Sequence, residues 1–200
     1  MTIGDVAVVR TGFVTTRKMK GASRREPCKY RLLNLKCIAD QGYIETEYLE
    51  SYEISEELKR DYLTRKGDIL IRLSSPYTAV IINRDELCGL LIPSHFAIVR
   101  VNAQLVVPEY VFWLLSQEKY RNIMIQNSSG STSFGTISAG VIAALPIAIL
   151  TLQEQELIGR LTMLAAREQE LLYRLVTEKK KYNSARLTQI YDNMKRGNIQ

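Results

Sequence analysis

"TLQEQELIGRLTMLAAREQELLYRLVTEKKKYNSARLTQIYDNMKRG", residues 151–197, decides the fold class because it predicts one long, uninterrupted helix. The stretch contains no proline, and Gly159 is its only glycine before Gly197. Thr151 is a suitable N-cap with Glu154 at the capping-box position, and Gly197 is a suitable stop. At 1.5 Å per residue such a helix is roughly 65 Å long. That exceeds the width of a small domain, so we expect part of the helix to project.

An apolar stripe follows this helix in alternating steps of four and three residues, interrupted by Glu168 and Glu178. Its members are Leu157, Leu161, Leu164, Leu171, Leu175 and Tyr182. A projecting helix with an apolar stripe needs a partner helix. We therefore expect a coiled coil with another chain or another domain. The alternative is a curved helix that packs only on its own domain.

The 150 residues before this helix have a mixed pattern. Runs of β-branched or alternating residues, separated by turn residues, predict strands. They lie at 6–10, 30–38, 67–73, 78–82 and 95–101. Further helices are expected over 108–127 and 137–145, and a last strand over 146–150. The predicted fold class is α+β: a mixed α/β domain over residues 1–150, followed by the long helix over 151–197.

Composition excludes several classes of protein. The chain has 200 residues, of which 46% are hydrophobic, enough for a sizeable core. No apolar run approaches the roughly eighteen residues of a membrane span, and the first ten residues do not resemble a signal peptide. Three widely spaced cysteines, Cys28, Cys37 and Cys88, fit reduced thiols in a cytoplasm. A single histidine without a C-x-x-C pair argues against a zinc site.

Positive charge is concentrated near the N-terminus. Residues 1–36 hold nine Lys or Arg and two acids, whereas the whole chain has a net charge of +6. Most of these bases lie in "RKMKGASRREPCKYR", residues 17–31. A dense basic segment is the electrostatic signature of binding to a phosphate backbone. A solvated loop that only aids solubility is the alternative.

A polar loop, "SSGSTSFGT" (128–136), has glycines spaced as in a phosphate-binding loop. However, Thr136 directly follows Gly135, where that motif requires a lysine. The preceding segment also predicts a helix, whereas a phosphate-binding loop follows a buried strand. We therefore exclude nucleotide hydrolysis and interpret the segment as a polar loop with another role, or as a plain surface turn.

No set of residues predicts an active site. "SSPY" (74–77) resembles the tetrad with which amino-methyltransferases hold a base, but Ser75 replaces its first proline and no Gly-rich loop for S-adenosylmethionine is present. Glu178 and Lys180 have a nuclease-like spacing but lie on the long helix, where we interpret them as surface residues. His95 is expected to have a packing or hydrogen-bonding role. We expect no catalytic residue, no metal ion and no cofactor in this chain.

The order of several segments resembles the specificity subunit of Type I restriction–modification systems. The segments are "KGDILIRLSSPYTAVII" (66–82), "VVPEYVFWLLSQEKYRNIM" (106–124), "SSGSTSFGTIS" (128–138) and "ALPIAILTLQEQELIGRL" (144–161), followed by the long helix. The most specific piece is "LPIAILTLQEQELI" (145–158), in which Glu154 and Gln155 open the helix. The resemblance covers essentially the whole chain.

This resemblance implies a non-catalytic DNA-binding subunit. In the family, a target recognition domain of mixed α/β fold recognises bases, and long helices space two such domains and dock methyltransferase subunits. The chain would direct S-adenosylmethionine-dependent methyltransferase subunits and restriction subunits to a bipartite target in the cytoplasm. Family members usually have two units, whereas this chain has one. It is therefore either a half-subunit that self-associates through the C-terminal helix, as a homodimer with inverted half-sites, or a truncated or divided product.

Three groups of side chains are then expected at the double-stranded DNA. They are Arg17, Lys18, Lys20, Arg24 and Arg25 on the basic segment, Arg72, Ser74 and Tyr77 after a strand, and Ser131, Thr132, Ser133 and Phe134 on the polar loop. Arginines pair bidentately with guanine, lysines suit phosphates, and hydroxyl groups meet either. A helical adaptor that never contacts DNA is the alternative function, and an enzyme without a recognisable motif is the third.

Overall fold

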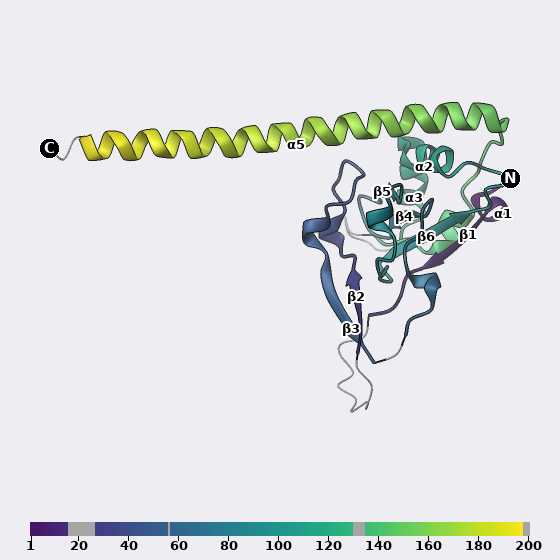
Figure 1. Cartoon of the computed structure of the whole chain (residues 1–200). Coiled ribbons are helices and arrows are strands. Elements are labelled where there is room, and N and C mark those ends of the chain that lie inside the picture. Colours follow the sequence, from purple (N-terminus) through teal and green to yellow (C-terminus); the bar gives the residue numbers. More distant parts are fainter. Residues whose placement is uncertain (16–26, 56, 130–134, 198–200) are drawn as a thin grey trace. The chain divides into compact units, whose positions relative to one another are not determined.

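The structure is a computed structural model that describes residues 1–15, 27–55, 57–129 and 135–197 (Figure 1). The chain forms two compact units, Met1–Met163 and Leu164–Gln200. The first unit holds all the strands of the described residues, and the second is helical.

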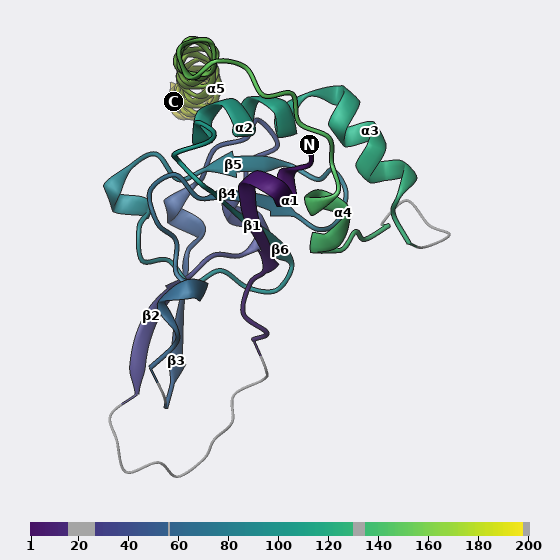
Figure 2. The ribbon, with the colours of Figure 1, turned by 90° about the vertical axis from the view of Figure 1, so that its right-hand side faces the viewer.

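A four-stranded antiparallel sheet forms the centre of the first unit (Figure 2). Its strands, in spatial order, are β1 (Ala7–Thr11), β6 (Phe96–Val101), β4 (Ile69–Arg72) and β5 (Ala79–Ile81). Val99 of β6 pairs with Val9 on one side and with Ile69 on the other, which fixes the register of the central strands. Four of the six strands expected from the sequence are therefore confirmed in this sheet.

Helices cover one face of this sheet. They are α1 (Ile3–Val6), α2 (Pro108–Ser116), α3 (Glu118–Gln126) and α4 (Ala139–Ala143), and their apolar residues share one core with Ile69 and Ile71 of β4. On the other face, Leu70 packs in a second core, which is closed by irregular segments around Leu33 and Ile92. Because both faces of the sheet are buried around β4, β5 and the first half of β6, these strands are almost continuously apolar rather than alternating.

A separate two-stranded ribbon consists of β2 (Cys28–Leu32) and β3 (Glu50–Ile54). Tyr30 of β2 lies opposite Tyr52 of β3, and the Tyr30 hydroxyl accepts a hydrogen bond from the Leu58 N–H at 3.0 Å. The strand predicted over 30–38 is shorter than expected, because β2 ends at Leu32. The strand β3 was not predicted, because its sequence, ESYEI, is charged and half-exposed. The 3-10 turns of the unit are η1 (Leu35–Cys37), η2 (Thr46–Tyr48), η3 (Arg60–Tyr62) and η4 (Asp85–Leu87).

The predicted helix 108–127 is two helices, because the backbone of Gln117 is extended (ψ 143°). The break places one tyrosine from each helix against the segment that follows α4. Tyr110 donates a hydrogen bond to the Ala148 carbonyl, and Tyr120 donates one to the Pro146 carbonyl, both at 2.8 Å. These side chains occupy carbonyls that a strand would pair, so the strand predicted over 146–150 is reduced to one isolated bridge with Thr2.

The long helix α5 (Leu152–Gly197, 46 residues) is confirmed. Its start has the expected capping box: the Thr151 N–H donates to the Glu154 carboxylate at 2.9 Å, and the Glu154 N–H donates to the Thr151 hydroxyl at 3.3 Å. At Gly159, a Cβ would lie 2.8 Å from the Glu109 Cβ, so glycine permits close packing of this end of α5 on α2. This packing explains why the first compact unit extends to Met163, beyond the expected boundary at residue 150.

Gln155 joins the start of α5 to two other segments. Its side chain is fully buried (0% exposed). Its amide oxygen accepts from the Val107 N–H, and its amide nitrogen donates to the Leu150 carbonyl, both at 2.9 Å. The predicted α+β class with a long C-terminal helix is thus observed. Specific polar contacts fix the first turns of this helix to the domain.

Candidate nucleic-acid interface

Strand directions bring several of the predicted DNA-binding segments to one end of the central sheet. Since β1 and β4 are both antiparallel to β6, they point the same way. Their last residues, Thr11 and Arg72, therefore lie at the end where β6 begins with Phe96. The Gly12 N–H confirms this proximity by donating to the Phe96 carbonyl at 3.0 Å.

The polar loop is attached to this same end. Ser129 and Thr136 exchange two backbone hydrogen bonds, at 3.0 and 3.3 Å, which close the base of the loop. Thr136 also forms an antiparallel bridge with Ser74, and the Ile137 N–H donates to the Leu73 carbonyl at 2.9 Å. Two segments that are far apart in the sequence, and that the resemblance placed at the DNA, thus lie side by side.

Tyr77 has a different place from the one expected. It is only 3% exposed, and its hydroxyl donates to the Gly135 carbonyl at 2.7 Å. A Cβ at Gly135 would lie 2.5 Å from the Ser128 hydroxyl oxygen, so the loop passes here too closely for a larger residue. The hydroxyl expected at DNA is therefore used within the protein, and we reinterpret Tyr77 as a residue that positions the polar loop.

Arg72 and Ser74 are both partly exposed at this end. The Arg72 side chain is 16% exposed, and its Nη1 lies 3.9 Å from a carboxylate oxygen of Asp40. That separation is longer than a hydrogen bond, so the described residues engage the guanidinium only weakly. Their proximity to the polar loop agrees with the predicted role, which stays a prediction.

Other predicted residues lie outside the described part of the chain. They are Arg17, Lys18, Lys20, Arg24 and Arg25 of the basic segment and Ser131, Thr132, Ser133 and Phe134 of the polar loop. The segments that border the basic stretch are described. Phe13 follows β1 and makes edge contacts with Tyr52 of the ribbon and with Tyr62, at ring-centroid distances of 6.4 and 5.4 Å.

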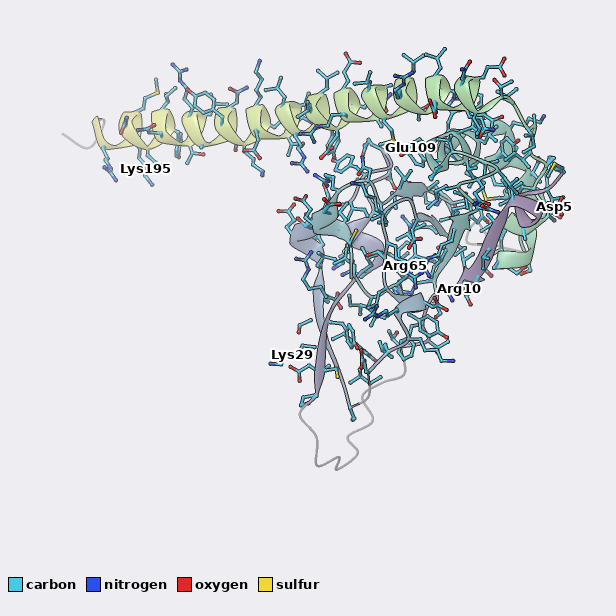
Figure 3. All side chains as sticks on the ribbon, turned by 45° about the vertical axis from the view of Figure 1, so that its right-hand side comes forward. Asp5, Arg10, Lys29, Arg65, Glu109 and Lys195 are labelled. Atoms are coloured by element: carbon cyan, nitrogen blue, oxygen red, sulfur yellow. The ribbon has the colours of Figure 1, made fainter. Side chains whose placement is uncertain are left out.

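The β2–β3 ribbon extends this candidate surface. Lys29, labelled in Figure 3, lies on the ribbon and pairs with Glu53 across the strands at 3.4 Å. A two-stranded ribbon has the width to enter a major groove. The sequence indicated only the first strand of the ribbon, because the second strand, ESYEI, is charged and half-exposed.

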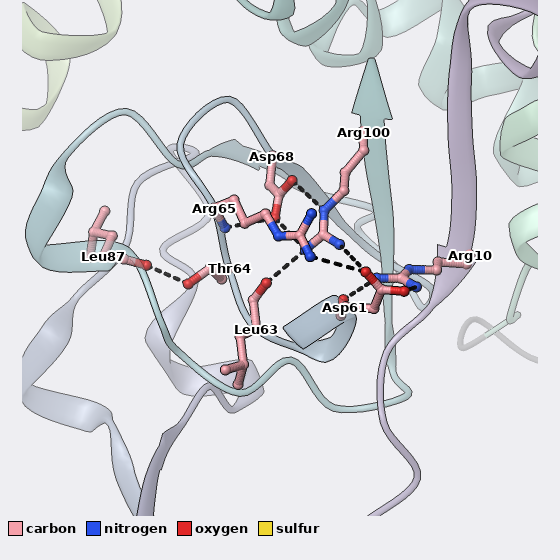
Figure 4. Close-up of polar contacts among 8 residues, drawn as sticks. All are labelled: Arg10, Asp61, Leu63, Thr64, Arg65, Asp68, Leu87 and Arg100. Carbon is pink, nitrogen blue, oxygen red and sulfur yellow. Dashed lines mark hydrogen bonds and ion pairs between the residues drawn. The ribbon is translucent and has the colours of Figure 1, made fainter. Parts of the chain in front are cut away.

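A polar network beneath one side of the sheet was also not predicted (Figure 4). Asp68, which is 2% exposed, accepts from Arg100 at 2.7 and 3.0 Å, and Arg100 also donates to the Leu63 carbonyl at 2.7 Å. The Asp61 carboxylate accepts a hydrogen bond from the Arg10 guanidinium, with 2.9 Å between Oδ2 and Nη1. This hydrogen bond is the main reason why the pKa of Asp61 lies below its usual value. The network fixes the 60–68 segment to β1 and β6, so we assign it a structural role.

The apolar stripe expected on α5 is at the surface. In the first unit, Leu157 and Leu161 are 53% and 59% exposed. In the second unit, the exposed fractions of Leu164, Leu171, Leu175 and Tyr182 are 69%, 50%, 53% and 63%. An apolar stripe this exposed is consistent with a partner helix, and its pairing stays a prediction.

Within the described ranges, no group of three or more His, Cys, Asp or Glu residues is arranged to hold a metal ion. All three cysteines are free. Nor does any helix in the described part of the chain combine the length and the apolar character needed to cross a membrane.

Comparison with known proteins bears on the fold. No protein-family model and no curated protein matches the sequence. Among solved structures, the chain is similar to the HsdS subunit from Thermoanaerobacter tengcongensis, with a TM-score of 0.61 and 16% identity. It is also similar to a chain of a type I R-M system complex, with a TM-score of 0.62 and 15% identity. A third similar structure is the Type I restriction–modification S subunit from M. genitalium, with a TM-score of 0.57 and 13% identity.

Each match covers 90% of this chain, but only 45%, 45% and 42% of the respective solved chains. The chain therefore spans less than half the length of these subunits. The resemblance inferred from the sequence is confirmed at the level of the fold: this chain has the fold of one part of an HsdS subunit.

Proposed function

We propose that this chain is a sequence-specific DNA-binding specificity subunit of a Type I restriction–modification system, without catalytic activity of its own. The observation that carries the proposal is the likeness in fold to HsdS subunits over 90% of the chain. The basic segment and the convergence of the polar loop with Arg72 and Ser74 add support.

In this proposal, three elements meet the duplex in different ways. Lysines of the basic segment neutralise phosphates, which gives affinity without sequence preference. Arg72, Arg24 or Arg25 pair with guanine edges in the major groove, which gives preference. The polar loop, held in place by Tyr77, adds hydroxyl groups that meet phosphates or bases.

The helix α5 supplies the spacing between two recognition domains. The solved subunits are about twice as long as the matched region, and the apolar stripe on α5 is exposed. A second copy of this chain, joined through the stripe about a two-fold axis, supplies the other half and requires inverted half-sites. Light scattering on the purified chain tests this: twice the 22.8 kDa mass supports it, and a monomer at all concentrations counts against it.

Chemistry is assigned to partners. Methyltransferase subunits bind S-adenosylmethionine and transfer the methyl group, restriction subunits cut, and this chain directs both to a bipartite target in the cytoplasm. Incubation of the chain alone with labelled S-adenosylmethionine and DNA should leave the DNA unlabelled. Label incorporation without a partner would show that the chain itself is an enzyme.

The decisive experiment is DNA binding at several salt concentrations, with the wild type, Lys20→Ala and the control variant Lys195→Ala. We expect Lys20→Ala to weaken binding to all duplexes alike and to flatten the salt dependence, because a phosphate contact is lost. Lys195 lies in the last turn of α5, so its replacement should change neither property. The exposed stripe on α5 also fits a helical adaptor, and failure of the wild type to bind any duplex would favour that function.

A further inference from the structure

Two buried nitrogens at the candidate interface have no hydrogen-bond partner among the described residues. They are Nε of Arg72 and Nε2 of His95. Arg72 ends β4 and His95 directly precedes β6, and the Leu73 N–H donates to the His95 carbonyl at 3.0 Å. The two side chains therefore belong to neighbouring strands at the same end of the sheet. Nearly all buried polar groups in proteins are hydrogen-bonded, so two unpartnered ones at the same end of the sheet point to a ligand that completes them.

The surroundings of the pair favour an acceptor-rich ligand. Burial is the main reason why the pKa of His95 lies below its ordinary value, and the positive charge of Arg72 adds to this. The acid that faces Arg72 is Asp40, at 3.9 Å, and its side chain is 77% exposed. The Phe96 ring, whose centroid is 4.9 Å from that of His95, adds no charge. The site thus holds a fixed cation and a neutral imidazole, with little compensating negative charge.

We propose that Arg72 and His95 together bind one acceptor group of the duplex, which is either a phosphate or the O6 and N7 edge of a guanine. This inference rests on the proposed DNA-binding function and adds His95, for which only a packing role was expected. Arginine binds either group through two parallel N–H bonds. Both residues are partly exposed, and in this proposal a change of side-chain rotamer turns the unpartnered nitrogens toward the ligand.

The protonation of His95 distinguishes the two sources. A phosphate brings negative charge, which favours the imidazolium form and raises the pKa of His95 on binding. Binding then takes up a proton and becomes tighter as the pH falls from the raised pKa of the complex towards the lower pKa of the free chain. A guanine edge is neutral and needs only the N–H of the neutral imidazole, so it leaves this pKa low.

His95 is the only histidine in the chain, so its imidazole proton resonance needs no assignment. We would titrate this resonance by NMR, from about pH 5 to 8, in the full-length chain alone, with inorganic phosphate, and with duplex DNA. A phosphate site predicts a rise in pKa of about one unit with phosphate and with the duplex. A guanine site predicts a shifted resonance with the duplex that disappears when 7-deazaguanine, which lacks N7, replaces guanine.

Variants separate ligand binding from a structural role. Arg72→Met and His95→Leu should lose at least about tenfold in affinity for the preferred duplex while keeping or raising the urea midpoint, because each removes an unpartnered buried group. Arg160→Met, on the exposed part of α5, is the matched control and should keep both properties. A lower urea midpoint with unchanged duplex affinity would assign the pair a structural role and overturn the inference.

The outcomes also separate this inference from the proposed function. If the duplex binds but the His95 resonance responds to neither phosphate nor duplex, the Arg72–His95 site is refuted and DNA binding stands. If no duplex binds but phosphate raises the pKa of His95, the site stands as an anion site and the proposed function is refuted.

Discussion

Replacement of Gln155 by methionine tests how the long helix is attached to the domain. Gln155 is fully buried and makes two hydrogen bonds at 2.9 Å, one from the Val107 N–H and one to the Leu150 carbonyl. Methionine has a similar length and a similar helix propensity, so it removes these hydrogen bonds with little change in packing or backbone preference.

The expected loss follows from the two backbone groups left behind. An unsatisfied buried donor or acceptor costs about 1–3 kcal/mol, and both groups here are only partly buried. The sum is about 2–4 kcal/mol, a large part of the roughly 5–15 kcal/mol that stabilises a typical domain. With a urea m-value of about 2 kcal/mol/M, the unfolding midpoint should fall by about 1–2 M.

Trp113 provides the assay because it is the only tryptophan and lies on α2 in the first unit. Its fluorescence during urea unfolding therefore reports on the domain rather than on fraying of the helix end. Gln153→Met, an exposed position in the same turn of α5, is the matched control and should leave the midpoint unchanged. Equal midpoints for the Gln155 and Gln153 variants would refute the idea that this side chain joins the helix to the domain.

Three further predictions concern other contacts. Tyr77→Phe deletes the hydrogen bond to the polar loop and should destabilise the domain by about 1 kcal/mol. In competition binding, this variant should prefer the cognate duplex less than the wild type does, at similar non-specific affinity. An unchanged preference would show that Tyr77 does not position the loop. Asp68→Asn should cost about 3 kcal/mol in urea unfolding because it leaves the Arg100 charge under-compensated, whereas Asp85→Asn, in an exposed ion pair, should cost almost nothing. The pKa of Glu154 is lowered by hydrogen bonds from the N-cap hydroxyl and N–H, so its stabilising effect is present above its ordinary pKa and lost as the pH falls through the folded value. Urea midpoints of Glu154→Gln should consequently vary less between about pH 3 and 6 than those of the wild type, and parallel pH profiles would contradict this.

Local patterns in the sequence determined the elements whose signals are local. The helix α5 was predictable because its period, its N-cap and its glycine stop lie within one continuous stretch. Four of the sheet strands were predictable for the same reason, since β-branched runs and turn residues mark them. The break at Gln117 had no such signal, because it contains neither proline nor glycine, and the contacts of the two flanking tyrosines with the segment after α4 join residues far apart in the sequence.

The candidate site depends both on residue chemistry, which the sequence shows, and on long-range contacts, which only the tertiary structure shows. The sequence identified Arg72, Ser74 and the polar loop as chemically suited to DNA, because charge and hydroxyl groups are visible in the residues themselves. Only the tertiary structure decided that Tyr77 is buried under the loop and that Arg72 and His95 lie at the same end of the sheet. Those facts depend on the pairing of β4 with β6 and on the return of the chain at Thr136. Contacts between residues so distant in sequence are set by packing of the whole domain, which no local pattern records.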